Sequence, residues 1–136
     1  AAASDVVVAV VGIDGSVEYE GHDRDNITLP GAQEALLEQL AAAAPRGAAQ
    51  IVVVLLNGGS VSSEFAARRA GAALDGLEGG MYGGAAVADA LFGAVNPSGV
   101  LPFTVYPPSF AAARDVKCCP KPRSSCTEAR GRFQRR

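Results

Sequence analysis

Two unbroken apolar runs dominate the first half of the chain. Residues 5–11 (DVVVAVV) and 50–56 (QIVVVLL) are rich in β-branched side chains, and polar positions do not alternate with apolar ones. Such runs are typical of strands that are buried on both faces of a parallel sheet. We therefore predict two central strands over these ranges.

A helical pattern follows the first strand, after a long polar loop over residues 12–29. The stretch GAQEALLEQLAAAA (31–44) comes after Pro30, which the first turn of a helix tolerates. Three leucines recur on one side of it, as expected for a helix that packs on a sheet (Leu36, Leu37 and Leu40). Pro45-Arg46-Gly47 is expected to end this helix.

The second half of the chain continues the alternation more weakly. Ser62 or Ser63 can cap a short helix that runs through Arg69, with the anionic Glu64 in its first turn. The small residues of 72–77 predict a poor strand, and a third helix is expected over 84–92. A last strand is expected over 100–106 (VLPFTVY), where a proline restricts it to a sheet edge.

This order of elements predicts an α/β protein. Strands that alternate with helices form an open, mostly parallel sheet with right-handed crossovers. We expect a three-layer α/β/α sandwich with an edge strand near residues 100–106. Ligands of such folds meet the carboxyl ends of the strands.

Charge divides the chain unevenly. Residues 1–113 hold 4 Lys or Arg and 12 Asp or Glu, whereas residues 114–136 hold 8 and 2. A terminal block this basic is more often a disordered tail than a site for polyanions, so no nucleic-acid partner is expected. We assign residues 4–110 to the folded domain and 111–136 to a basic, disordered tail. The three cysteines (Cys118, Cys119 and Cys126) all lie in this tail, without the spacing of a zinc site, and no metal or cofactor is expected.

No run approaches the roughly 18 apolar residues of a membrane span, so no membrane partner is expected. The chain begins AAASDVVVAVVG, without Met or a basic segment, so we expect no signal peptide. The localisation stays open, and we expect the chain to be part of a longer protein.

Candidate chemistry concentrates in residues 16–24 (SVEYEGHDR), directly after the first strand. A nucleotide site is disfavoured because GIDG lacks the dinucleotide spacing and NGGSVSS lacks the P-loop lysine. Serine catalysis is disfavoured because G-x-S-x-G is absent. Carboxylate chemistry fits better, because glycoside hydrolysis uses two carboxyl groups on opposite sides of a sugar ring. By spacing alone, a solvated acidic loop remains the simplest interpretation.

Glu18 and Glu20 are expected to alternate along an extended segment, so their side chains would point in opposite directions. One of them would then face a sugar, while the other pairs with Arg24 or meets solvent. Because Glu20 is nearer to Arg24 in sequence, we expect Glu20 to have the structural role. The single histidine, His22, is expected to be a surface or hydrogen-bonded loop residue and not a base.

Three segments of the chain resemble the C-terminal α/β sandwich domain of family-3 glycoside hydrolases, the β-glucosidases, β-xylosidases and related exo-acting enzymes. They are the first strand and its loop up to LPGAQEALLEQL, then IVVVLLNGGSV, and then GGAAVADALFGAVNPSGVLPFTVYP. The resemblance covers about residues 4–110. It departs at ALDGLEGG, where the family has an apolar strand that ends in a Tyr/Trp-Pro-Gly turn.

The resemblance implies a retaining, exo-acting β-glycosidase in which a preceding TIM-type barrel supplies the nucleophilic Asp. This chain would then hold no nucleophile and would be inactive alone, with a β-linked glycoside and the barrel as its partners. The family position of the general acid/base matches Glu18, with Glu20 as second candidate. Asp23 and Arg24 match a D-R pair that we expect to form an ordering salt bridge, and together with His22 they are candidates for substrate contact. The alternative is a non-catalytic carbohydrate-binding or scaffold domain, and glucose or xylose specificity stays open.

Overall fold

The two apolar runs form neighbouring parallel strands at the centre of the fold. β1 (Val7–Gly12) pairs with β2 (Ile51–Leu56) in parallel, with Val7 opposite Ile51. β3 (Ala72–Asp75) joins the other side of β2, also in parallel, so the strand order is β1-β2-β3. The computed structural model describes residues 3–113, and this sheet has three strands within that range. The α/β class and the parallel sheet are as predicted.

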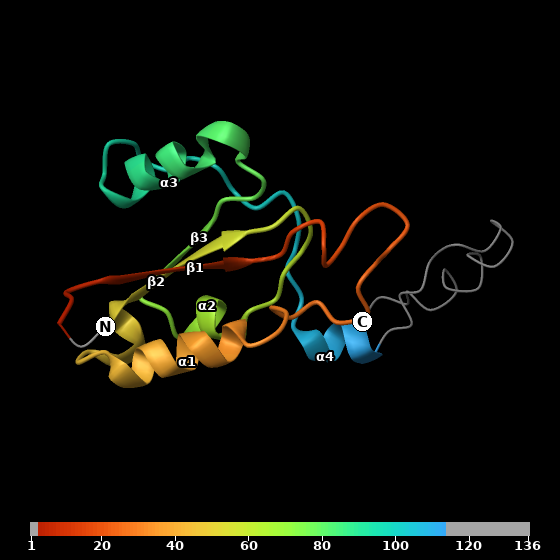
Figure 1. The fold of residues 1–136 in the computed structure, drawn as a ribbon, viewed down its shortest axis with the longest axis horizontal. Helices are drawn as coiled ribbons and strands as arrows, with labels where there is room; N and C mark the ends of the chain where they lie inside the picture. The colour runs from red at the N-terminus through yellow and green to blue at the C-terminus, as the bar shows by residue number, and fades with distance from the viewer. Residues whose placement is uncertain (1–2, 114–136) are drawn as a thin grey trace, which may run out of the picture.

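Helices lie on both sides of the sheet (Figure 1). α1 (Gln33–Ala43) and α2 (Glu64–Arg68) lie on one side, and α3 (Gly83–Leu91) lies on the other. Two short 3-10 turns precede β2 and α3, and a last helix closes the described range: η1 (Gly47–Gln50), η2 (Gly80–Tyr82) and α4 (Pro108–Ala113). Ser63 caps α2, because its side chain accepts a hydrogen bond from the amide of Ala66 at 3.1 Å.

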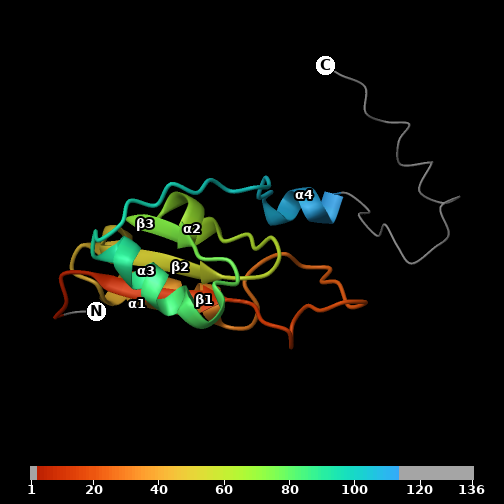
Figure 2. The ribbon, with the colours of Figure 1, turned by 90° about the horizontal axis from the view of Figure 1, so that it is seen from above.

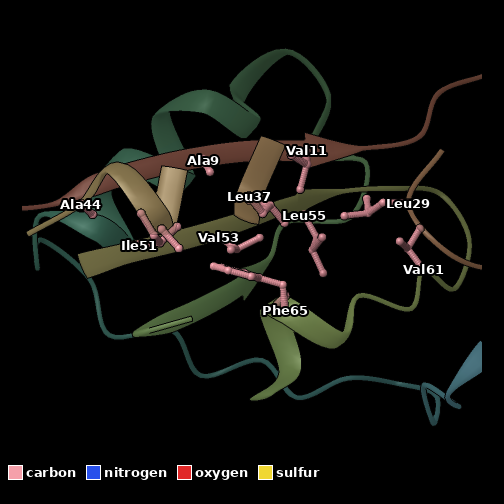
Figure 3. Packing of buried hydrophobic residues seen from close by; sticks show 12 residues of the cluster. Ala9, Val11, Leu29, Leu37, Ala44, Ile51, Val53, Leu55, Val61 and Phe65 are labelled. Carbon is pink, nitrogen blue, oxygen red and sulfur yellow. The ribbon is translucent and has the colours of Figure 1, made fainter. Parts of the chain in front are cut away.

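The core lies between the sheet and the first two helices (Figure 3). Leu37 of α1 and Phe65 of α2 are fully buried against Ile51, Val53 and Leu55 of β2. Burial of a side chain of this size contributes about 1.5–3 kcal/mol, so these contacts fix the position of both helices on the sheet.

The opposite face of the sheet is covered much less. Val8 and Val10 of β1 are 46% and 58% exposed, and no residue of α3 is buried. A groove of about 570 Å³ separates the sheet from α3, with Val54 and Val87 among its lining residues. The helix therefore lies over this face without sealing it.

The first helix begins later than expected. Gly31 has a φ of 62°, a left-handed conformation that a helix cannot contain, so α1 begins at Gln33 and Pro30 lies outside it. The buried side of α1 holds Leu37 and Ala41, whereas Leu36 is 47% exposed. The expected apolar side was therefore wrong at Leu36.

The predicted edge strand over 100–106 is absent. The segment runs without regular structure, and Val100 is 90% exposed. Pro102 lacks the amide hydrogen that a sheet ladder needs, and the neighbouring β3 has only four residues to pair with. The apolar pattern of this segment was therefore not enough to form a strand, because no partner strand pairs with it within the described residues. The predicted basic tail begins at 111 and lies almost entirely outside the described residues.

Candidate active site

The polar loop extends beyond the carboxyl ends of the strands (Figure 1, Figure 2). It leaves β1 after Gly12 and reaches α1 at Gln33. The connections that follow β2 and β3 begin at the same end of the sheet, because all three strands are parallel. This is the end at which ligands of open α/β sheets bind.

A tight turn over residues 14–18 starts the loop. The carboxylate of Asp14 accepts hydrogen bonds from the hydroxyl of Ser16 at 2.5 Å and from its amide at 2.8 Å. The carbonyl oxygen of Asp14 also accepts from the amides of Val17 and Glu18. These two hydrogen bonds from Ser16 hold the pKa of the Asp14 carboxyl below its usual value, and the bond from the hydroxyl has the larger effect. The hydrogen bonds to the Asp14 carbonyl fix the backbone at Glu18.

A second turn, Tyr19–His22, carries Glu20. The backbones of Tyr19 and His22 exchange two hydrogen bonds, and their rings stack with centroids 5.0 Å apart. Gly21 has a φ of 81°, which suits the third position of a type II turn. Glu20 is at the exposed tip of this turn. The extended segment predicted here was therefore wrong, although the two glutamates do separate.

Arg24 pairs with Glu18. Its Nε donates to Oε2 of Glu18 at 2.6 Å, and its side chain is only 9% exposed. Nη1 donates to the carbonyl of Thr28 at 3.2 Å, and Nη2 donates to the carbonyl of Ser60 at 2.8 Å. The expected Asp23–Arg24 and Glu20–Arg24 pairs are not among the salt bridges of the described residues. The turn at Tyr19–His22 folds the chain back, which brings Arg24 to Glu18.

These turns surround a small polar hollow of about 260 Å³. Its lining residues come from the connections that follow the three strands, the first of which is the polar loop: Ile13, Asp14, Glu18, Tyr19, Asp23, Gly58, Gly59 and Glu78. Of the predicted site residues, Glu18 and Asp23 line the hollow, while Glu20, His22 and Arg24 do not. Arg24 contacts the hollow indirectly, through Glu18.

Two glycines make room for carboxylates in this hollow. A Cβ atom at Gly59 would lie 3.2 Å from Oε1 of Glu18, and one at Gly58 would lie 2.5 Å from Oε1 of Glu78. Gly58 and Gly59 therefore let Glu18 and Glu78 lie close to the backbone after β2. No motif selects Glu78, because its position beside Gly58 depends on how β3 ends next to β2.

The described residues contain no helix that is long and apolar enough to cross a membrane. Within the same range, no group of three or more His, Cys, Asp or Glu side chains is arranged to hold a metal ion.

Comparison with known proteins identifies a family for this chain. Residues 1–128 match the glycosyl hydrolase family 3 C-terminal domain. Over 112 residues the chain is 46% identical to β-D-xylosidase 3 of Arabidopsis thaliana. The aligned region covers 81% of this chain and 14% of that protein.

Two further relatives carry other names. The chain is 40% identical to β-xylosidase/α-L-arabinofuranosidase 2 of Medicago sativa subsp. varia, over 81% of this chain and 14% of that protein. It is 44% identical to an exo-α-(1->6)-L-arabinopyranosidase of Bifidobacterium longum, over 72% of this chain and 12% of that protein. The chain thus spans about one seventh or less of the length of these relatives, and it belongs to glycosyl hydrolase family 3, to the C-terminal domain of that family.

Proposed function

We propose that this domain supplies the general acid/base to a retaining, exo-acting β-glycosidase, with Glu18 as the acid/base residue. The observation that carries the proposal is that Glu18 lines the hollow at the carboxyl ends of the strands and that one third of its side chain is exposed there. A carboxyl group fixed in a partly open hollow can reach a substrate and can exchange a proton with it.

The reaction requires two carboxyl groups about 5–5.5 Å apart, one as nucleophile and one as acid/base. In the first step Glu18 gives its proton to the glycosidic oxygen as the bond to the anomeric carbon breaks. The nucleophilic carboxylate bonds to that carbon and comes from the barrel domain of the longer protein. In the second step Glu18 takes a proton from water, and the water oxygen replaces the carboxylate on the sugar. No cofactor takes part.

The names of the relatives support one substrate class. Those with the β-xylosidase name are similar over about four fifths of this chain, which favours a β-linked xyloside over a glucoside. Asp23 is the candidate for a hydrogen bond to a sugar hydroxyl, because it lines the same hollow as Glu18. Glu20 is the second candidate for the acid/base, at the exposed tip of the Tyr19–His22 turn and outside the lining of the hollow. His22 stacks on Tyr19 and would contact substrate only at the rim.

We also propose the three-layer sandwich as the architecture of the domain in the longer protein. α3 lies on the side opposite α1 and α2 (Figure 1). Its apolar residues Val87 and Leu91 line a groove that Val8 and Val10 of β1 also line. If α3 packed closely on the sheet in the longer protein, the side chains of Val87 and Leu91 and those of Val8 and Val10 would be buried.

A non-catalytic carbohydrate-binding or scaffold domain is the alternative. The two functions differ in what the separate chain and the full-length protein can do. We expect the purified 136-residue chain to hydrolyse no aryl-β-xyloside or aryl-β-glucoside, because all its carboxylates belong to the domain that supplies only the acid/base. The full-length protein should hydrolyse the xyloside and should lose that activity on Glu18→Gln. Turnover by the separate chain would contradict the proposal, and a full-length protein that binds xylosides without hydrolysing them would favour the alternative.

A further inference from the structure

Tyr19 is the aromatic residue among those that line the polar hollow. The other lining residues are four carboxylates, two glycines and Ile13. Tyr19 is 58% exposed, so its ring is not part of the core. Aromatic side chains together with a few fixed polar groups are the usual lining of sites for small molecules. Tyr19 is therefore placed to contact a ligand in the hollow.

The turn that carries Tyr19 also supports its ring. The amide of His22 donates to the Tyr19 carbonyl at 2.9 Å, and the amide of Tyr19 donates to the His22 carbonyl at 3.3 Å. The two rings are nearly parallel, with 18° between their planes, so the imidazole covers one face of the phenol ring. Among the described residues, no second ring stacks on Tyr19. One face is thus supported and the other is left for a ligand. A ring that is already supported loses little freedom on binding.

Acceptors for hydroxyl groups share the hollow with this ring. Asp23 and Glu78 both line it, and neither belongs to a salt bridge of the described residues. An ionised carboxylate only accepts hydrogen bonds, so its preferred ligand carries O–H or N–H donors. A pyranose has C–H bonds on the faces of its ring and hydroxyl donors around its rim. The hollow, at about 260 Å³, is slightly smaller than sites for drug-sized ligands, which suits a single sugar ring.

We infer that the free face of Tyr19 stacks on a pyranose ring in the hollow, which makes Tyr19 a substrate-binding residue. The inference deepens the proposed function, because it requires that the hollow binds sugar. It does not require that Glu18 is the acid/base. The contact is made by the face of the phenol ring, so the hydroxyl group of Tyr19 is not needed for it.

Binding of a sulfur-linked β-xyloside, which resists hydrolysis, to the full-length protein tests the inference by calorimetry. Tyr19→Ala and Tyr19→Leu should each raise Kd about 5–10-fold, because both remove the aromatic face and leucine keeps an apolar side chain. Tyr19→Phe should stay within about twofold of the unchanged protein. Tyr82→Ala is the matched control, because Tyr82 is also exposed and does not line the hollow, and it should leave Kd unchanged.

Three results would overturn the inference. Unchanged Kd in Tyr19→Ala and Tyr19→Leu would show that the ring makes no contact. An equal loss in Tyr19→Phe would assign the effect to a hydrogen bond from the hydroxyl group. An aromatic ring beside carboxylates can also bind an organic cation. Competition between tetramethylammonium and the xyloside, lost in Tyr19→Leu, would therefore assign the ring to a cation.

Nuclear Overhauser contacts in the 136-residue chain provide a readout that needs no variant to fold. The C–H protons of the bound xyloside should contact the ring protons of Tyr19 and shift upfield. Contacts with Tyr82 or Tyr106 instead, or no contact with Tyr19 at a xyloside concentration that saturates the full-length protein, would overturn the inference. If these contacts appear while Glu18→Gln leaves hydrolysis intact, the acid/base assignment fails and the role of Tyr19 stands. If Glu18→Gln abolishes hydrolysis while the Tyr19 variants bind normally, the inference about Tyr19 fails alone.

Discussion

The side-chain amide of Gln33 binds both backbone groups of Gly12. Its Oε1 accepts from the Gly12 amide at 2.7 Å, and its Nε2 donates to the Gly12 carbonyl at 2.9 Å. The first residue of α1 thereby holds the last residue of β1, and the polar loop between them begins and ends at one fixed point. The turns that carry Glu18 and Glu20 are anchored at this point.

Gly12→Ala should destabilise the chain strongly. Gly12 has a φ of 156°, and a Cβ atom there would lie 1.8 Å from the carbonyl oxygen of Leu56. Because backbone must move to relieve this contact, we expect a loss of about 2–4 kcal/mol in the free energy of unfolding, measured in urea. Gly15→Ala is the control, because nothing lies within 4 Å of its Cβ position. Equal stability of the two variants would contradict the packing at Gly12.

The turn at Asp14 should weaken in acid. The hydrogen bonds from Ser16 lower the pKa of Asp14 in the folded state, so the carboxylate contributes to stability above the ordinary value of 3.8. That contribution is lost as the pH falls through the lower, folded pKa. Carboxyl carbon NMR should place the Asp14 midpoint below 3.8, and Ser16→Ala should raise it. A midpoint at or above the value of the same residue in the denatured chain would show that the turn does not form.

Gly59→Ala should impair activity more than Gly58→Ala in the full-length protein. The new methyl group at Gly59 would lie 3.2 Å from Oε1 of Glu18, a carboxylate that Arg24 holds in place. At Gly58 the contact is with Glu78, whose exposed side chain can swing away. We expect kcat to fall about tenfold for Gly59→Ala and less than twofold for Gly58→Ala. Thermal melting of both variants checks that neither has unfolded, and a reversed order of the two losses would contradict this arrangement of the hollow.

The sequence predicted the elements whose local pattern and tertiary environment agree. The β-branched runs of β1 and β2 form strands because each has a neighbour to pair with, and Ser63 caps α2 as its residue type favours. The segment over 100–106 has a similar pattern but finds no partner. Strand formation depends on pairing, which local pattern does not contain.

The candidate site was predicted in part for the same reason. Glu18 and Asp23 were selected by motif, and both line the hollow. The partner of Arg24 was predicted wrongly, because sequence distance favoured Glu20 while the turn closed by Tyr19 and His22 brings Glu18 within reach. Glu78 could not be selected at all, since only the pairing of β3 with β2 brings its loop to Gly58.

The most direct measurement is the leaving-group dependence of Glu18→Gln and Glu20→Gln in the full-length protein. With Glu18 as the acid/base, Glu18→Gln should lower the rate on a natural xylosyl disaccharide by roughly 10²–10⁴-fold. Aryl xylosides with activated leaving groups need little protonation and should lose less in the first step. Azide should restore turnover where the second step limits, because it attacks without a base.

Glu20→Gln, the matched control at the exposed turn tip, should keep nearly full activity on every substrate. Nearly full activity of Glu18→Gln on the disaccharide would contradict the assignment of Glu18 as the acid/base. In that case, loss of activity in Glu20→Gln would assign the acid/base to Glu20, and full activity in both variants would show that the loop only covers the substrate.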